Sequence, residues 1–463
     1  MNSRAEKSTS STVFSPSGAA PDLTALARSN SARYPYLLES AAAGSELASY
    51  DILFAYPEET LRLDGAGEVS GPHSVAQSFL SSLDNWWLAE RDNDRSGGLP
   101  FCGGWFLFLG YELAGEVEPS LRLTHDPELP VAFATRIPVA VIREHPGGKI
   151  TVVAEEGYAD HIPQVIEDLE AACLQPATDT ALNIARINED DPALFIEAVR
   201  KAQEYIAAGD IFQANLSRCW RISLNTETHP VDLYKRLRTA NPSPFAGLIQ
   251  HDDFALLSSS PERLVRRLGM RLDTRPIAGT RPRLEGPDEA DEQKQALLDN
   301  PKERAEHVML IDLERNDLGR VCEGGTVQVD EFMAVESYSH VHHIVSNVTG
   351  IAREGLLPGE LVRAVFPGGT ITGCPKVRCM EIIHELEQRP RGAYTGSIGY
   401  LNRNGDCDLN ILIRTMCLRG SEIEIAAGSG IVADSDPQAE LDETRAKAKG
   451  LLLALQDERD AAA

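Results

Sequence analysis

The sequence has no run of about 18 consecutive apolar residues, the length that a helix needs to cross a bilayer. Its first residues, MNSRAEKSTSSTVFSPSGAAPD, also lack the apolar core of a signal peptide. We therefore expect no membrane segment. Residues 1–30, which are rich in serine and alanine, are assigned to a flexible N-terminal tail.

Paired cysteines are missing as well. The chain has 8 cysteines, but none form a C-x-x-C pair and none has histidines at metal-ligand spacing. These absences argue against a zinc site and against a disulfide framework. Scattered single thiols are typical of proteins in a reducing compartment, so we expect a cytoplasmic location.

Positive charge is scarce: the chain has 44 basic and 70 acidic residues, and its formal net charge is -26. A field of this sign repels nucleic acid and anionic lipid headgroups, so neither is expected as a partner. A small anionic substrate would need local compensation from a metal ion or from a few arginines and lysines.

The chain falls into two patterned regions. Residues 31–173 contain short strand-like segments such as YDILFAYP, GGWFLFLGYEL and KITVVAEE, which predict a β-rich N-terminal region. Residues 174–191 show no sustained periodicity and are assigned to a linker. Residues 192–456 form the second region. The glycine-rich FPGGTITG within it lacks the Lys-Ser/Thr ending of a phosphate-binding loop.

The second region mixes helical and extended patterns. Residues 192–208 have a helical period, and GDIFQANLSRCW after them alternates like a strand. An N-cap, a first-turn proline and a capping glutamate in Asn300-Pro301-Lys302-Glu303 predict a helix from Pro301 towards Asn316. Alternation in SYSHVHHIVSNVTG, GAYTGSIGYL, DCDLNILIRTMCL and EIEIAAGSGIVA predicts further strands, and the pattern is that of a mixed α+β domain dominated by antiparallel strands.

The last predicted helix, which opens at Asp436-Pro437, carries charged residues on one face. Glu440, Glu443 and Lys447 follow at spacings of three and four. A solvated face with an ion pair is the ordinary use of such a stripe. The alternative is Mg²⁺ ligation by the two carboxylates, with Glu306 supplied by the helix that starts at Pro301.

Other candidate residues lie in strands or at their ends. Arg414, inside the apolar NILIRTM, is a candidate for binding a substrate carboxylate or for a structural ion pair. Glu262 follows a proline after an apolar strand and is either a general acid or a surface residue. His340 and His342 are expected to face opposite to His343, so one strand cannot direct all three at one ion.

Taken together, many segments in one order resemble the chorismate-utilising enzymes across residues 195–455. They are GDIFQANLSR, SSSPERL, TRPIAGTRPR, RAEHVMLIDLERNDLGRV, SHVHHIVSNVTG, FPGGTITGCPKVRCMEII, GSIGYL, IRTM, GSGIVADSDP and ELDET. A weaker match includes PYLLES at 35–40. The resemblance implies one α+β fold in which two stacked antiparallel β-sheets are flanked by helices.

The resemblance also implies a chorismate site that uses Mg²⁺. In this pattern Glu306 and Glu443 are the metal ligands, with Glu440 nearby, and Glu262 protonates the departing C4 hydroxyl. His343 would aid orientation or proton movement. The residues implied to bind the substrate are Arg414, Lys376, Thr370, Tyr400 and the backbone of Gly428, Ser429 and Gly430.

Gln213 is the informative position for the type of reaction. Members of this family that add water to chorismate have a lysine there as general base, and a glutamine cannot remove that proton. Ammonia needs no such activation, so Gln213 favours amination. No glutaminase nucleophile motif of the form G-x-C-x-G is present, which implies that ammonia comes from a separate glutaminase subunit.

Two aminating branches remain open. The sequence QANL at 213–216, together with PGGTITG and GSIGY, resembles the branch that forms aminodeoxychorismate. Ala278 resembles the anthranilate-forming branch, because known aminodeoxychorismate synthases have a nucleophilic lysine there. Leu38, Glu39 and Ser40 resemble the tryptophan pocket of the family, although an edge strand would look the same. A non-catalytic tryptophan-binding subunit is a third alternative, against which the intact Glu262, Glu306, Glu443 and His343 speak.

Overall fold

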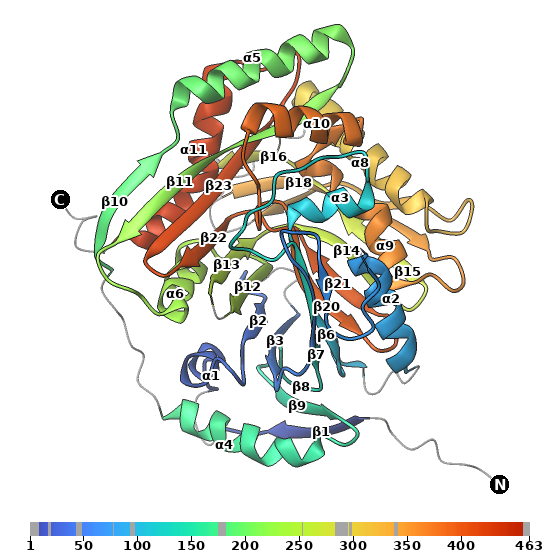
Figure 1. Cartoon of the computed structure of the whole chain (residues 1–463), viewed down its shortest axis with the longest axis vertical. Helices are drawn as coiled ribbons and strands as arrows, with labels where there is room; N and C mark the ends of the chain where they lie inside the picture. The colour runs from blue at the N-terminus through green and yellow to red at the C-terminus, as the bar shows by residue number, and fades with distance from the viewer. Residues whose placement is uncertain are drawn as a thin grey trace.

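Two large antiparallel β-sheets stack against each other, and helices cover their outer faces (Figure 1). The computed structural model describes residues 9–16, 20–42, 49–76, 78–92, 98–174, 182–251, 253–282, 295, 299–337 and 341–456. The arrangement confirms the predicted α+β class of two stacked sheets flanked by helices.

Both sheets draw on strands from the two halves of the chain. The first sheet runs in the order β1 (Thr9–Phe14), β9 (Ile150–Glu155), β8 (Val139–Glu144), β3 (Tyr50–Ala55), β2 (Tyr36–Glu39), β12 (Phe245–Gln250), β13 (Ala255–Ser260), β22 (Thr415–Arg419), β23 (Glu422–Ile431), β11 (Gln213–Leu224) and β10 (Ile184–Glu189), and β19 (Gly373–Cys374) pairs with β11. The second runs β16 (Ile277–Pro282), β18 (Val341–Ile351), β15 (Arg271–Arg275), β14 (Arg263–Leu268), β21 (Cys407–Asn410), β20 (Ser397–Asn402), β6 (Gly104–Leu109), β7 (Ala132–Ile137), β4 (Thr60–Leu63) and β5 (Val69–Ser70), and β17 (Gln328–Ser337) pairs with β18.

The helices begin where local capping signals occur. Asn300 Oδ1 accepts a hydrogen bond from Glu303 N at 3.4 Å, and Asp436 Oδ1 accepts one from Ala439 N at 2.8 Å, as the N-cap rule predicts. The helices are α1 (Thr24–Ser29), α2 (Phe79–Glu90), α3 (Ala114–Val117), α4 (Ile162–Cys173), α5 (Pro192–Ala208), α6 (Pro230–Ala240), α8 (Pro301–Gly319), α9 (Pro358–Val365), α10 (Lys376–Glu387) and α11 (Pro437–Leu455), with the 3-10 helix η4 at Gly369–Ile371.

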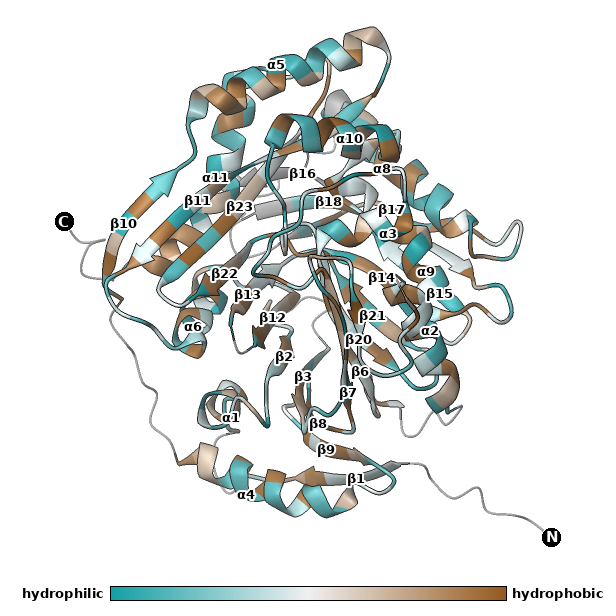
Figure 2. Cartoon of the chain, in the orientation of Figure 1, coloured by the Kyte–Doolittle hydropathy of each residue, from teal (hydrophilic) through white to brown (hydrophobic). Residues whose placement is uncertain are grey.

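Alternation along β6 shows how the layers form. Phe106 and Phe108 belong to the apolar cluster between the two sheets, whereas Leu107 and Leu109 belong to the cluster beneath helices α2, α8 and α9. Each central strand therefore buries both faces. Figure 2 shows the same contrast, with apolar residues concentrated on the central strands and polar and apolar residues mixed along the outer helices α4 and α5.

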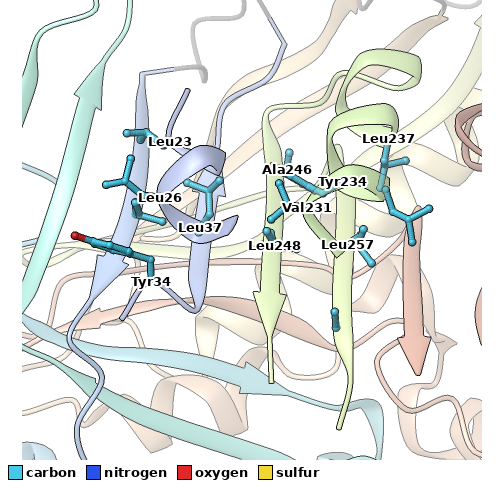
Figure 3. Packing of buried hydrophobic residues seen from close by; sticks show 14 of the residues in the cluster. Leu23, Leu26, Tyr34, Leu37, Val231, Tyr234, Leu237, Ala246, Leu248 and Leu257 are labelled. Atoms are coloured by element: carbon cyan, nitrogen blue, oxygen red, sulfur yellow. The ribbon is translucent and has the colours of Figure 1, made fainter. Parts of the chain in front are cut away.

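The N-terminal segments pack directly on the second half of the chain. Leu23, Leu26 and Leu37 belong to the same buried cluster as Leu248 and Leu257 (Figure 3). Strand β2 pairs with β12, so the first sheet is continuous across both predicted regions. The boundaries drawn at 31–173, 174–191 and 192–456 thus mark stretches of sequence that share their sheets.

Two predicted segments differ from the structure. Residues assigned to the flexible tail form β1, which pairs with β9, and the buried helix α1. Part of the predicted linker is β10, which pairs with β11. β1 and β10 were missed because each is a short polar strand at an edge of the first sheet, stabilised by a partner that is distant in the sequence.

Arg414 does not lie inside a strand, contrary to the prediction for NILIRTM. β21 ends at Asn410 in the second sheet and β22 begins at Thr415 in the first, so the chain crosses between the sheets here. Arg414 has a left-handed φ of 51°, which turns the chain at the crossing. No helix among the described residues is long and apolar enough to span a bilayer.

Candidate active site

Two glycines of β23 lie beneath a group of polar side chains. A Cβ atom at Gly428 would lie 2.7 Å from Asn215 Oδ1 and 2.8 Å from the Tyr394 hydroxyl oxygen. A Cβ atom at Gly430 would lie 2.4 Å from Gln213 Nε2. Since residues two apart on a strand share a face, Gln213 and Asn215 lie over the same surface. Glycine is required here for space, because larger residues would displace these groups.

Two polar atoms at this surface are buried without a hydrogen bond to any described residue. They are Gln213 Oε1 and Asn215 Oδ1. Asn215 Nδ2 donates to the Thr370 carbonyl oxygen at 3.4 Å, which ties β11 to η4. Because buried polar atoms are nearly always hydrogen-bonded in folded proteins, these atoms mark a surface that is completed by a ligand or solvent.

Acidic side chains from two helices approach the same stretch of β23. Gln213 Nε2 lies 3.4 Å from Glu306 Oε1 on α8. On α11, Glu443 Oε1 pairs with Lys447 Nζ at 2.8 Å, and that ammonium donates to the Gly428 carbonyl oxygen at 2.9 Å. Glu306 therefore lies at the Gly430 end and Glu443 at the Gly428 end of one short segment.

The predicted metal ligands are not assembled into one cluster. Within the described residues, no group of three or more His, Cys, Asp or Glu side chains has the geometry of a metal site. Glu440 is buried, whereas the Glu443 side chain is half exposed beside Lys447. The two carboxylates from α8 and α11 nevertheless fit Mg²⁺, which is often held by one or two carboxylates together with water and substrate oxygens.

Glu262 is buried between β13 and β14. Its backbone N donates to Ser260 Oγ at 3.3 Å, and its carbonyl oxygen accepts from Ile411 N at 3.0 Å. Burial raises the pKa of its carboxyl to about 7, against the opposing effects of the Thr370 hydroxyl and the Ile277 backbone N–H. A carboxyl in this state can hold a proton near neutral pH and release it to a leaving group.

Two cations face Glu262 from separate elements. Lys447 on α11 and Arg414 at the crossing between the sheets both act to favour its ionised form. The Arg414 carbonyl oxygen also accepts from Ser259 N at 3.1 Å, which holds the crossing against β13. These two side chains supply the local positive charge that a small anion would need in this acidic protein.

His343 lies on β18, beside the segment that carries Ala278. Its Nδ1 is 3.3 Å from the Gly279 carbonyl oxygen, and the residue is buried. The backbone of Ala278 pairs with Ile344, whereas the side chains of Ala278 and His342, and all of His340, lie outside the described residues.

Lys376 begins α10 and pairs with an acid on α8. Its Nζ donates to Asp317 Oδ2 at 2.6 Å. The buried Glu314 lies next to this ion pair, and burial, reinforced by Asp317, raises its pKa to about 8. Lys376 thus belongs to a buried charged group beside Glu262, and its ammonium is already engaged by a carboxylate.

Tyr400 was predicted to bind the substrate, and the structure places it elsewhere. It lines a cavity of about 390 Å³ together with Leu38, Glu39 and Ser40. Tyr394 occupies the position expected of Tyr400, because its hydroxyl lies over Gly428. GAYTGSIGYL contains two tyrosines six residues apart, and only the tertiary structure shows which one faces β23.

The 390 Å³ cavity is bounded by both sheets, since Leu38 belongs to β2 and Tyr400 to β20. Glu39 is buried and its Oε1 accepts from Arg238 Nη1 at 2.9 Å. The Ser40 hydroxyl donates to the Pro244 carbonyl oxygen at 3.3 Å. The three predicted residues thus share one cavity, which is distinct from the surface at Gly428.

Comparison with known proteins identifies the family. The sequence pattern of the chorismate binding enzyme family matches residues 33–453. The chain belongs to this family. An anthranilate synthase component I-like protein from Synechocystis sp. is 43% identical over 364 residues, covering 77% of this chain and 74% of the relative.

Other relatives of the chorismate binding family carry two different names. Aminodeoxychorismate synthase component 1 of Bacillus subtilis is 41% identical over 384 residues, covering 80% of this chain and 81% of the relative. Anthranilate synthase component 1 of Thermus thermophilus is 40% identical over 433 residues, covering 91% and 92%. These relatives match the same chain, but their names specify two different enzymes, aminodeoxychorismate synthase and anthranilate synthase.

Solved structures agree with the fold. Anthranilate synthase component I from Streptococcus pneumoniae has a TM-score of 0.77 at 32% identity, covering 88% of this chain and 93% of that one. MenF, the menaquinone-specific isochorismate synthase from Escherichia coli, has a TM-score of 0.74 at 19% identity, covering 97% and 94%.

Two residues at or near this surface were not singled out from the sequence. Tyr394 could have been found from its place in RGAYTG, where a tyrosine precedes a glycine turn. Glu314 lies in the acidic DLERND, which gives no local sign of burial. Only the packing of α8 against the chain at 369–370 shows that this carboxyl is enclosed.

Proposed function

We propose that this chain is the chorismate-aminating subunit of an aminodeoxychorismate synthase, forming 4-amino-4-deoxychorismate from chorismate and ammonia on the route to 4-aminobenzoate and folate. The observation that carries the proposal is Gln213, whose buried Oε1 has no hydrogen-bond partner among the described residues. An amide oxygen can accept an N–H from ammonia and orient its lone pair. It cannot deprotonate water, which a hydrating enzyme requires.

The substrate would lie over Gly428 and Gly430. Arg414 and Lys447 supply positive charge for its carboxylates, and the strand backbone approaches closely because it has no side chains there. The Asn215 amide and the Tyr394 and Thr370 hydroxyls offer hydrogen bonds to ring substituents. These contacts would fix the ring relative to Glu262 and Gln213.

Glu262 would act as the general acid. Its protonated carboxyl gives a proton to the C4 hydroxyl oxygen as the C4–O bond breaks and water leaves. Neutral ammonia forms the new C4–N bond, and the resulting nitrogen carries one proton more than the product amine. Loss of that proton restores the acid form of Glu262, so the step is balanced without another reactant.

Glu306 and Glu443 are the residues that would hold Mg²⁺. Bound there, the ion would neutralise substrate carboxylate charge as a Lewis acid. Glu440 is one helical turn before Glu443 and buried, which suits an indirect role through water. Because ammonia is mostly ammonium at neutral pH, a separate glutaminase subunit would supply the nitrogen.

Product analysis tests the proposal. Purified protein is incubated with chorismate, Mg²⁺ and ammonium, and an aminodeoxychorismate lyase is then added. We expect 4-aminobenzoate only after the lyase is added. Fluorescent anthranilate with release of pyruvate, without the lyase, would overturn the proposal. Absence of turnover with any nucleophile would support a non-catalytic role instead.

Anthranilate synthesis is the second candidate. It is favoured by Ala278, whose methyl group cannot act as the nucleophile that a lysine would provide at this position. The 40% identity to anthranilate synthase component 1 of Thermus thermophilus points the same way. The product assay above separates the two, because only anthranilate formation releases pyruvate.

We further propose that the 390 Å³ cavity binds tryptophan. Its size lies within the range of small-molecule sites, and Leu38, Phe245 and Tyr400 provide apolar and aromatic walls. Calorimetry with L-tryptophan should show saturable binding that Ser40→Phe abolishes by filling the cavity. Equal affinity in the variant would remove this assignment.

A further inference from the structure

Arg391 is a buried arginine that the proposed mechanism does not use. It lies in the loop between α10 and β20, and its side chain is 1% exposed. Two of its hydrogen bonds go to Glu387 at the end of α10, from Nε to Oε2 at 3.0 Å and from Nη2 to Oε1 at 2.6 Å. This carboxylate supplies the opposite charge that a buried guanidinium requires. The other hydrogen bonds of the guanidinium need a separate explanation.

The other hydrogen bonds reach two elements that carry the surface at Gly428. Nη2 donates to the Asn215 carbonyl oxygen on β11 at 2.6 Å, and Nη1 donates to the Ile371 carbonyl oxygen in η4 at 3.1 Å. Nη1 also donates to Thr395 Oγ1 at 3.3 Å. The Asn215 amide lies over Gly428 and donates to the carbonyl oxygen of Thr370, the residue before Ile371. One guanidinium therefore ties together the two backbone segments that orient this amide.

The same guanidinium lies over two tyrosine rings. Its Cζ is 4.9 Å from the ring centroid of Tyr111 and 5.6 Å from that of Tyr394. A cation in this position is attracted to the face of the ring, and the attraction is stronger when both groups are desolvated. The Tyr394 N–H also donates to the Arg391 carbonyl oxygen at 3.0 Å. Arg391 thus contacts the ring that carries the second polar group over Gly428.

Arg391 is itself held in a fixed position. Its backbone N donates to Glu112 Oε1 at 2.7 Å, and Gly392 N donates to both oxygens of the same carboxylate at 3.2 and 3.1 Å. Glu387 Oε1 accepts further hydrogen bonds from the N and Oγ of Ser217, at 2.8 and 2.9 Å. The loop and the carboxylate that orients the guanidinium are therefore both anchored to other elements.

We propose that Arg391 is a positioning residue for the chorismate site, and that it fixes the Asn215 amide and the Tyr394 hydroxyl over Gly428 before the substrate binds. A planar guanidinium has donors in fixed directions and can reach a carboxylate and two carbonyl oxygens at once. A lysine ammonium can replace the charge but not this fork of donors. The inference rests on the proposed function in placing the substrate over Gly428.

A purely structural role for Arg391 makes a different prediction. If Arg391 only neutralises Glu387, then Arg391→Lys should be active whenever it is folded. If it acts through Asn215 and Tyr394, the folded variant should be impaired. Its effect should also shrink once those two side chains have been shortened, because residues that act through one another are not additive.

The test is kcat/KM for chorismate, followed as loss of chorismate with Mg²⁺ and ammonium, with circular dichroism to show that each variant is folded. Arg391→Lys should lower kcat/KM by about 10- to 100-fold, because misplacing contact groups by about 1 Å can cost this much. In the Asn215→Ala/Tyr394→Phe background, the same substitution should lower it by less than about threefold. Equal losses in the two backgrounds would overturn the inference.

Arg389→Lys is the matched control. Arg389 lies two residues earlier, and its Nη2 is 3.8 Å from Glu387 Oε2. It donates to Ser217 Oγ at 2.7 Å and to the Pro390 carbonyl oxygen at 3.3 Å, instead of to the backbone of β11 and η4. This variant should leave kcat/KM unchanged. A loss as large as that of Arg391→Lys would show that any altered cation beside Glu387 suffices, and would overturn the inference.

A second variant and a second measurement do not depend on the folding of Arg391→Lys or on turnover. Glu387→Gln keeps the size of the side chain but offers one acceptor oxygen in place of two, so it loosens the guanidinium. Calorimetry with chorismate and Mg²⁺ should show weaker binding in Glu387→Gln, and no further weakening when Glu387→Gln is added to the Asn215→Ala/Tyr394→Phe background. Wild-type affinity in Glu387→Gln would refute the proposal. Formation of anthranilate would overturn the proposed function alone, because both measurements follow chorismate and not the product.

Discussion

The surface at Gly428 and the 390 Å³ cavity satisfy their polar groups in opposite ways. Over Gly428, the buried oxygens of Gln213 and Asn215 have no hydrogen-bond partner among the described residues. In the 390 Å³ cavity, Arg263 binds Asp408 through two hydrogen bonds of 2.8 and 2.9 Å, and Glu39 is paired with Arg238. The acceptors of the first region are left for a ligand or solvent, whereas these charged groups of the second are paired within the protein.

This contrast teaches what each region is suited to do. Unpaired donors and acceptors in fixed positions can contact groups whose charge changes during a reaction, which is the basis of electrostatic catalysis. Paired charges and an aromatic wall instead define the shape of a cavity: Tyr400 lines it, and its ring packs against that of Phe101 with the ring centroids 5.8 Å apart. Changes in the first region should therefore alter turnover, and changes in the second should alter binding.

The largest expected effect is that of Glu262→Gln. The amide cannot give a proton to the departing hydroxyl, so kcat should fall by about 10²- to 10⁴-fold with little change in melting temperature. Tyr400→Phe, in the other region, is the matched comparison and should keep wild-type kcat. Steady-state kinetics with both variants checks the contrast, and near-normal kcat in Glu262→Gln would break it.

Glu306→Gln and Glu443→Gln should have the next largest effect. Each removes one hard oxygen ligand from the helices that flank β23, so the Mg²⁺ concentration for half-maximal activity should rise by about 10- to 100-fold. Mg²⁺ titration of turnover measures this. Glu424→Gln on the same strand is a suitable control, because its carboxylate pairs with Arg221. Unaltered Mg²⁺ dependence in both helix variants would contradict the assignment.

Gly428→Ala should have a moderate effect. It tests the difference between the surface at Gly428 and the 390 Å³ cavity. The added methyl would lie 2.6 Å from the Leu216 carbonyl oxygen, so backbone must shift, at a cost of about 1–3 kcal/mol for overpacking. We expect KM for chorismate to rise about tenfold. Gly247→Ala, near the other cavity, would first meet the flexible end of Ile398 at 2.9 Å and should leave KM unchanged.

The sequence predicted best those features that depend on neighbouring residues. The caps at Asn300 and Asp436 lie within four residues of the groups they bind, so α8 and α11 were placed correctly. The carboxylates on these helices then followed from helical spacing. The alternation of GDIFQANLSRCW likewise predicted the strand β11, which carries Gln213.

Features that depend on distant partners were not predicted. β1 and β10 are polar edge strands held by β9 and β11, and Arg414 turns where the chain leaves one sheet for the other. The choice between Tyr394 and Tyr400 depends on which strand each faces. Glu314 is enclosed by η4, about 55 residues further along the chain, and no local pattern indicates that contact.

Gln213→Lys should have the smallest effect on total turnover and the clearest effect on product. The amide already lies 3.4 Å from Glu306 Oε1, so a lysine there would be drawn towards that carboxylate, which keeps a fraction of its ammonium charged. The remaining neutral amine can act as a base for water, so isochorismate should become detectable by chromatography while amination decreases a fewfold. Gln213→Met, similar in size but without a base, should lose amination without gaining hydration. Identical products from the lysine and methionine variants would mean that position 213 does not face the nucleophile, and the distinction between the two regions would then rest on Glu262 alone.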